Sequence, residues 1–349
     1  MQTKNQNNQQ EPKTNNLQIR NSIYASAVGD AWGNITEFNF SPDIKNPQLY
    51  PLHAFVTDDT QMALYALLGL KNSPNISDLD LNQEKDKTII RREIGKQFLV
   101  WLKDPDNNRA PGQTCLNALN ILKFKRNKTG LEGTQPHSKG CGANMRNPWF
   151  GLLPYTESEI VELSYIQAEI THSHPLAYSA SALTALAVKD IYTQNVILEK
   201  GKPNLFVSLI KTTERLIANN CNSNPAVKEG LIMMQKFLTQ RQEAYYRMIS
   251  NDDAITDICD YLNAEGWVAE EALLLAVATA DLHQYDLFRA LERAVHTRGD
   301  SDSIACISGS IIGAGISTEL DWLKEMSDRL EPRYLKELEE SISYLTDLK

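Results

Sequence analysis

The feature that most constrains this chain is the recurrence of apolar residues at helical spacing over most of its length. One such stretch lies in residues 90–102, and others follow in residues 205–217 and 335–345. A period of about 3.6 residues places one face of each helix against a core, whereas strand-like alternation is scarce here. The sequence therefore predicts one all-α domain over residues 17–349, with Gly and Pro concentrated in irregular segments between the helices.

The N-terminal segment, residues 1–16, has a different composition. Nine of its 16 residues are Asn or Gln, and only Met1 is apolar. A segment of this kind buries too little apolar surface to offset the entropy lost on ordering, so we expect a disordered polar arm. Either the arm is a passive tail or it becomes ordered on a partner.

Composition excludes several classes of protein. The chain has 349 residues and a formal net charge of -9, so it lacks the global basic character of a nucleic-acid-binding protein. Its longest apolar run, near residues 272–280, is shorter than the roughly 18 residues of a membrane span, and residues 1–16 contain no signal-peptide core. Its five cysteines show no CxxC spacing, which is typical of reduced thiols. We expect a cytoplasmic protein that binds neither nucleic acid nor membrane.

Three short segments combine carboxylates with glycine or with a helix start. Residues 29–37 read GDAWGNITE, residues 57–60 read TDDT, and residues 299–303 read GDSDS. Each alone has an ordinary explanation. Glu37 is then a solvated residue after a helix end, Thr57 is an N-cap, and the aspartates favour the positive end of a helix dipole.

The combination of the three segments predicts a metal site. If their loops meet at one end of a helical bundle, five carboxylates come together: Glu37, Asp58, Asp59, Asp300 and Asp302. Such a cluster repels itself strongly unless cations neutralise it. Carboxylates with the hydroxyls of Thr57 and Ser303 form an all-oxygen ligand set, which favours two Mg²⁺ ions, or Mn²⁺, over zinc or copper.

In this order the three segments resemble the signature of the ADP-ribosylglycohydrolase family. Residues 138–146, SKGCGANMR, resemble its glycine-rich loop, and residues 171–174, THSH, resemble its T-H element. Residues 265–273 resemble the stretch before its last acidic loop. The resemblance covers residues 19–315 and implies an all-α orthogonal bundle with an acidic binuclear Mg²⁺ cleft.

The resemblance also implies roles for individual residues. It implies metal binding by Thr57, Asp58, Asp59, Asp300, Asp302 and Ser303. It implies Glu37 and Asp58 as catalytic residues, with Glu37 beside the metals, where it either ligates them or acts as an acid or base. It implies ADP-ribose binding by Ser138, Gly140, Cys141, Gly142, Met145, Arg146 and His172.

Some positions leave an ordinary alternative open. His172 is also explained as a histidine at a helix start, Met145 as a core residue and Arg146 as a structural partner. The chain departs from the family pattern at Ser303, which stands where threonine is usual and keeps the hydroxyl. It departs again at Arg298, in place of a glycine, and at Cys141, in place of an asparagine.

The implied activity is Mg²⁺-dependent removal of ADP-ribose from modified proteins, with the ADP-ribosyl-arginine N-glycosidic bond as the first expectation. Cleavage of a ribosyl bond develops oxocarbenium character, and Glu37 would move a proton while bound Mg²⁺ activates water. The sequence does not fix the carboxylate that reads the arginine. Asp104 and Asp106 lie in the expected region, as does Asn117, and all three are also explained as surface-loop residues.

A second hypothesis is an immunity protein. Here the arm of residues 1–16 inserts into the active site of an ADP-ribosyltransferase toxin, as in some bacterial immunity proteins of this family, and both activities can coexist. A third is an inert family member with a structural use. The retained carboxylates argue against the third, because an unused buried cluster of charges is costly.

Overall fold

The computed structural model describes residues 11–38, 49–219, 224–251 and 257–348, with side chains from residue 16 onward. Residues 1–10 of the expected polar arm lie outside this part. A helix, Glu11–Gly33, takes in residues 11–16, so the expected boundary at residue 17 falls within a helix.

The regular elements within the described ranges are helices. In the first half they are α1 (Glu11–Gly33), α2 (Asp58–Lys71), η1 (Ile76–Asp78), α3 (Glu84–Trp101), α4 (Gln113–Lys125), η2 (Cys141–Ala143), η3 (Pro148–Leu152), α5 (Glu157–Ala168) and α6 (Pro175–Tyr192). In the second half they are α7 (Asn204–Ala218), α8 (Pro225–Ser250), α9 (Ile258–Leu262), α10 (Ala269–His283), α11 (Leu287–Val295), α12 (Ser301–Gly313), α13 (Asp321–Ser327) and α14 (Pro332–Asp347). The all-α fold expected from the sequence is confirmed, and the three periodic stretches become α3, α7 and α14.

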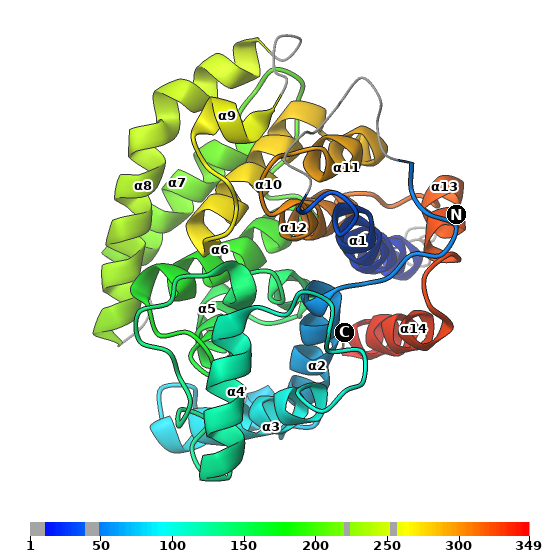
Figure 1. The fold of residues 1–349 in the computed structure, drawn as a ribbon. Helices are drawn as coiled ribbons and strands as arrows, with labels where there is room; N and C mark the ends of the chain where they lie inside the picture. Colours follow the sequence, from blue (N-terminus) through cyan, green and yellow to red (C-terminus); the bar gives the residue numbers. More distant parts are fainter. Residues whose placement is uncertain (1–10, 39–48, 220–223, 252–256, 349) are drawn as a thin grey trace, which may run out of the picture.

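The centre of the bundle is α12, which is buried along its whole length and packs against α1, α10 and α11 (Figure 1). Glycines allow α1 and α12 to approach closely. A Cβ on Gly33 would lie 2.4 Å from Cα of Asp302, and one on Gly309 would lie 2.3 Å from the carbonyl oxygen of Ala25. This close packing fixes the start of α12 beside the end of α1.

Three groups of helices lie around this centre (Figure 1). α6, α7, α8 and α10 contact one another on one side, while α2, α3 and α4 follow one another on another side. α13 and α14 pack against α1. In the described part of the chain, every helix is too short or too polar to span a bilayer. The first turns of α2 and α12 and the segment after α1 are brought together by this arrangement.

Candidate functional site

A pocket of about 200 Å³ opens where the acidic segments meet the glycine-rich loop. It is lined by Glu37, Asp58, Asp59, Ala110, Gly112, Gln113, Thr114, Cys115, Gly140, Cys141, Gly142, Met145, His172, Trp267, Asp300, Asp302 and Ser303. Larger hollows occur elsewhere on the described surface, up to about 610 Å³. The convergent carboxylates, rather than the size of the hollow, single out this pocket.

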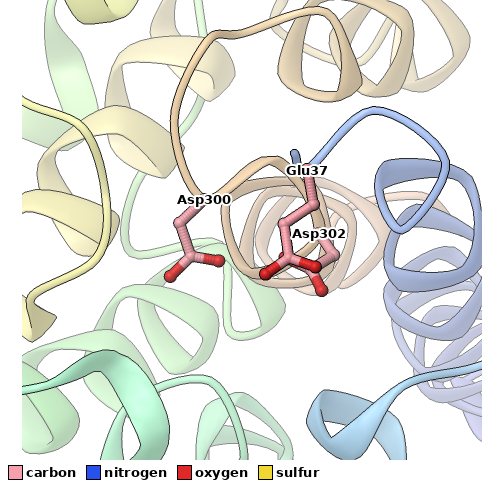
Figure 2. A group of neighbouring side chains, drawn as sticks. All are labelled: Glu37, Asp300 and Asp302. Atoms are coloured by element: carbon pink, nitrogen blue, oxygen red, sulfur yellow. The ribbon is translucent and has the colours of Figure 1, made fainter. Parts of the chain in front are cut away.

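Three carboxylates converge most tightly. Glu37, Asp300 and Asp302 are all buried, and each contributes an oxygen that lies within 4.8 Å of the other two (Figure 2). Glu37 is held by a turn in which its backbone N–H donates to the carbonyl of Gly33 (2.9 Å). Asp300 directly precedes α12 and Asp302 lies in its first turn. Two segments far apart in the sequence therefore supply oxygens at a spacing that suits a hard cation.

Asp58 and Asp59, at the start of α2, line the same pocket. Asp58 Oδ2 accepts a hydrogen bond from the Gly112 N–H (3.2 Å). By contrast, Asp59 Oδ2 and Glu37 Oε2 are buried without a hydrogen-bond partner. Buried carboxylate oxygens without partners are costly, so these residues fit a bound cation. All five carboxylates predicted to meet do line one pocket.

The electrostatics of the cluster follow from burial and crowding. Burial, followed by the charge of Asp302, raises the pKa of Glu37 to about 9 and that of Asp58 to about 8. The same causes raise the pKa values of Asp59 and Asp300 well above their ordinary range. A cation among these groups favours their charged forms and so opposes the shifts.

The two hydroxyls expected to bind metal lie beside the carboxylates. Thr57 caps α2, and its hydroxyl donates to Asp30 Oδ1 (2.7 Å), with Asp302 Oδ2 at 3.4 Å. Ser303 lines the pocket, and its hydroxyl donates to Met145 Sδ (3.9 Å). A donating hydroxyl keeps lone pairs for a ligand. Both positions therefore remain compatible with metal binding.

Asp30 is a residue whose role the sequence analysis missed. It is fully buried in α1, and its carboxylate accepts hydrogen bonds from the backbone N–H groups of Thr57 (3.0 Å) and Thr60 (3.1 Å). Both threonine hydroxyls donate to it as well. Asp30 thus fixes the TDDT turn on α1. The available signal was a charged residue inside an otherwise apolar helical run.

The glycine-rich loop forms the opposite wall with His172. A Cβ on Gly142 would lie 3.2 Å from Cε1 of His172 and 2.8 Å from Sγ of Cys115, so glycine permits this close approach. Nδ1 of His172 is 2.8 Å from the Thr171 hydroxyl. Burial, with the charge of Arg146, lowers the pKa of His172 to about 3, which keeps the imidazole neutral. Gly140, Cys141 and Met145 complete this wall.

Two residues expected to contact ADP-ribose do not line the pocket. The Ser138 hydroxyl is hydrogen-bonded to that of Thr114 (2.9 Å). Arg146 is fully buried, and it donates to Gln167 Oε1 (2.6 Å) and to the Thr171 hydroxyl (2.8 Å). The structure thus places Arg146 as a structural partner that supports the threonine beside His172.

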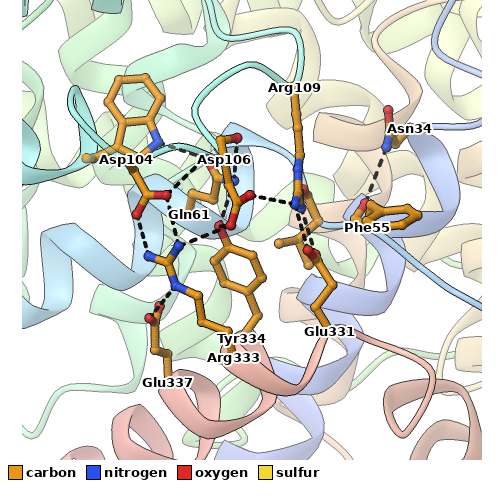
Figure 3. A network of polar contacts seen from close by, with 12 residues as sticks. Asn34, Phe55, Gln61, Asp104, Asp106, Arg109, Glu331, Arg333, Tyr334 and Glu337 are labelled. Atoms are coloured by element: carbon orange, nitrogen blue, oxygen red, sulfur yellow. Dashed lines mark hydrogen bonds and ion pairs between the residues drawn. The ribbon is translucent and has the colours of Figure 1, made fainter.

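The carboxylates considered for reading an arginine are already paired within the chain (Figure 3). Asp104 forms a two-bond ion pair with Arg333, and Asp106 lies 3.1 Å from the same guanidinium. Arg333 lowers the pKa of Asp104 to about 2.

Arg298, which replaces a glycine of the family pattern, pairs with Asp260 (2.7 Å) instead of adding a cation to the pocket.

Other residues that line the pocket belong to no motif that could have identified them from the sequence. The loop before α4 supplies Ala110 and Gly112, and the first turn of α4 supplies residues 113–115; only folding brings them to the acidic segments. Trp267 lines the pocket and stacks on Phe38, with ring centroids 6.3 Å apart and an angle of 19° between the planes. Phe38 directly follows Glu37, so this contact lies beside the carboxylate cluster.

Comparison with known proteins agrees with this geometry. The model of a family described as ADP-ribosylglycohydrolase matches residues 12–347. The chain is 24% identical to "ADP-ribosylhydrolase ARH1" of Dictyostelium discoideum over 198 aligned residues. These residues make up 49% of this chain and 47% of that protein. It is 24% identical over 319 residues to "Uncharacterized protein YegU" of Escherichia coli (strain K12), with 85% and 86% covered. A solved structure titled "ADP-ribosylglycohydrolase-related protein complex" shares the fold with a TM-score of 0.58, 18% identity and coverage of 96% and 98%.

Proposed function

The chain belongs to the ADP-ribosylglycohydrolase family, and from this premise we propose that it is a metal-dependent hydrolase that removes ADP-ribose from modified proteins. The observation that carries the proposal is the convergence of five buried carboxylates on one pocket walled by a glycine-rich loop. An all-α scaffold has no structural need for this set of charges, which is costly when it is not neutralised.

The residues that would hold the metal are the carboxylates of Asp58, Asp59, Asp300 and Asp302, with the hydroxyls of Thr57 and Ser303. Their oxygen-only character favours Mg²⁺, with Mn²⁺ as a substitute, and two ions offset most of the cluster charge. When bound, such ions supply charge neutralisation and a water of lowered pKa. The unpartnered buried oxygen of Asp59 supports this assignment.

Glu37 is the proposed proton-transfer group. One of its oxygens is buried without a partner in the pocket, and its pKa is raised to about 9 by burial and neighbouring carboxylates. A bound cation opposes this shift, so in the metal-loaded site we propose that Glu37 either protonates the leaving group or accepts a proton from attacking water. Asp58, held by the Gly112 N–H, is proposed to orient that water.

The wall opposite the carboxylates is proposed to bind ADP-ribose. Gly140 and Gly142 let the backbone approach the ligand without a Cβ. The imidazole of His172 is neutral, so one ring nitrogen donates and the other accepts a hydrogen bond, which suits ribose hydroxyls. We place Cys141 and Met145 in the same subsite and assign Ser138 and Arg146 a supporting role behind it.

The bond that we propose first is the N-glycosidic bond of ADP-ribosyl-arginine. Because Asp104 and Asp106 pair with Arg333, the arginine would be read by another group or by the metal-bound cluster. The test uses protein substrates modified on arginine, on serine or on a carboxylate, each incubated with the full chain and Mg²⁺. Release of free ADP-ribose from the arginine-linked protein supports the assignment, and release only from another linkage replaces it.

As the alternative we propose an immunity protein that blocks an ADP-ribosyltransferase toxin through its N-terminal segment. The Asn- and Gln-rich composition of residues 1–16 favours it. Deleting residues 1–10, which leaves α1 intact, is expected to weaken binding to a transferase and to spare hydrolysis. Equal binding by the truncated chain, measured by calorimetry, would reject this alternative.

A further inference from the structure

Two backbone segments meet at the carboxylate of Asp58. Asp58 begins α2, directly after Val56 and Thr57. Its Oδ2 accepts a hydrogen bond from Gly112, the last residue of the loop between α3 and α4 (3.2 Å). The direction of this carboxylate in the pocket therefore depends on how the segment before α2 and the loop before α4 lie relative to each other.

Arg109 joins these two segments to α14. Its backbone belongs to the loop before α4, and its Nη1 donates to the carbonyl oxygen of Val56 (2.9 Å). The two terminal nitrogens also donate to the two carboxylate oxygens of Glu331, at 2.7 and 2.6 Å (Figure 3). The guanidinium lies over the rings of Phe55 and Tyr334, with centroids 5.4 and 5.6 Å away. Only a planar guanidinium with several donors makes all these contacts at once.

Glu331 directs its carboxylate to Arg109 and not to its own helix. It occupies the N-cap position of α14, yet its side chain makes no capping hydrogen bond. A side chain at this position can accept a hydrogen bond from the first backbone N–H groups of the helix. Here the carboxylate instead binds Arg109 through two parallel hydrogen bonds, a geometry that fixes the plane of the guanidinium.

From these contacts we infer that Arg109 and Glu331 are positioning residues of the metal centre, although neither lines the pocket. The pair fixes the position of the segment before α2, which contains Val56, relative to the loop that contains Gly112. The Gly112 N–H in turn orients the carboxylate of Asp58. The residue at the start of α14 thereby influences the geometry of the carboxylate pocket through the loop before α4. This inference rests on the proposed function, because it assumes that the carboxylates bind a divalent cation.

A second ion pair on α14 provides a matched control. Arg20, on α1, donates to the two oxygens of Glu339 at 2.6 and 3.0 Å, which is the same bidentate geometry on the same helix. Neither Arg20 nor Glu339 belongs to the pocket. Because Arg20 and Glu339 are more exposed than Arg109 and Glu331, the Tm of each metal-free variant is needed to separate a loss of stability from a loss of metal affinity.

The experiment compares Arg109→Lys and Glu331→Gln with Arg20→Lys and Glu339→Gln in the full chain. Mn²⁺ affinity is measured by titration calorimetry, and the Tm of the metal-free protein is measured separately. We expect Arg109→Lys to weaken Mn²⁺ binding about tenfold or more, since changes behind metal ligands commonly cost 10- to 100-fold. Glu331→Gln, which keeps one acceptor oxygen, is expected to lose several-fold, and both control variants should bind Mn²⁺ within twofold of the wild type.

Unchanged Mn²⁺ affinity in both Arg109→Lys and Glu331→Gln would overturn the inference, as would an equal loss in the control pair. If Arg109→Lys fails to fold, Glu331→Gln, which conserves volume, decides the result alone. If the wild-type chain binds no Mn²⁺, the proposed metal centre fails and the inference with it. Tight wild-type binding with unaffected variants rejects only the positioning role.

Discussion

Replacing Asp30 with alanine tests the most connected polar group behind the site. In the wild type this buried carboxylate accepts hydrogen bonds from the backbone N–H groups of Thr57 and Thr60, at 3.0 and 3.1 Å, and from both hydroxyls. In Asp30→Ala the hydroxyls are free to rotate towards other acceptors. The two N–H groups point in a fixed direction at the start of α2 and lose their partner.

The magnitude follows from those two groups. Leaving one buried donor unsatisfied costs about 1–3 kcal/mol, so two cost about 2–6 kcal/mol. One effect opposes this loss: in the metal-free protein, burial and then charge repulsion from Asp302 raise the pKa of Asp30, and the variant removes both costs. We therefore expect the free energy of unfolding of the metal-free chain to fall by about 2–4 kcal/mol, the lower part of the range.

Asp281 provides the matched control away from the pocket. It is also buried, and it accepts from the backbone N–H groups of Leu205 (2.9 Å) and Phe206 (3.0 Å) at the start of α7. Asp281→Ala should destabilise the fold by a similar amount. Only Asp30→Ala should also lose the rise in Tm that Mn²⁺ gives, because it alone releases the turn that carries Asp58.

The assay is urea unfolding followed by circular dichroism, together with Tm values at increasing Mn²⁺. Our reasoning is refuted if Asp30→Ala unfolds within 0.5 kcal/mol of the wild type, or if it retains the full Mn²⁺-dependent rise in Tm. It is equally refuted if Asp281→Ala loses that rise to the same extent. A loss confined to Asp30→Ala links the buried carboxylate of α1 to the geometry of the metal ligands.

Three further predictions follow. In Gly33→Ala the new Cβ would lie 2.4 Å from Cα of Asp302, so the free energy of unfolding, measured in urea, should fall by about 1–3 kcal/mol. In the control Gly112→Ala the Cβ meets open space, and the change should be less than about 0.5 kcal/mol. Equal effects would contradict the close packing of α1 and α12. In the metal-free protein, the raised pKa values of Glu37, about 9, and Asp58, about 8, mean that the folded state holds protons that the unfolded state releases. Stability to urea should therefore fall as pH rises from about 5 to 9 and should depend less on pH with Mn²⁺, whereas a rise over that range would show that these groups are ionised when folded. Glu37→Gln should reduce turnover at least about 100-fold and leave Mn²⁺ affinity within tenfold; if calorimetry shows that Mn²⁺ binding is lost too, Glu37 is a required ligand rather than a proton-transfer group.

Much of the fold was predictable because its signals are local. The periodic apolar stretches become α3, α7 and α14, and the apolar run at residues 272–280 lies in the buried helix α10. The acidic segments were equally visible, since each places carboxylates within a few residues of a helix end or a helix start. Their convergence on one pocket followed from placing their loops at one end of a bundle.

The rest of the site depends on long-range contacts that no local pattern encodes. Asp30 binds residues 57 and 60 only because α1 and α2 cross near the pocket. Arg146 belongs to the glycine-rich motif, yet the fold directs its guanidinium to Gln167 and Thr171, behind the pocket wall. The sequence around Asp104 indicates only a surface loop. Its partner, Arg333, lies near the C-terminal end of the sequence.

The metal dependence of ADP-ribose release tests the central claim most directly. The full chain is incubated with arginine-ADP-ribosylated protein in Mg²⁺, in excess EDTA, and in EDTA followed by excess Mg²⁺. Asp302→Asn is the site variant, and Asp321→Asn, on the exposed start of α13, is its control. We predict release in Mg²⁺, loss in EDTA, recovery on adding Mg²⁺, and loss in Asp302→Asn alone. Release that persists in EDTA, or that survives in Asp302→Asn, would contradict a metal-dependent hydrolase built on the acidic cluster.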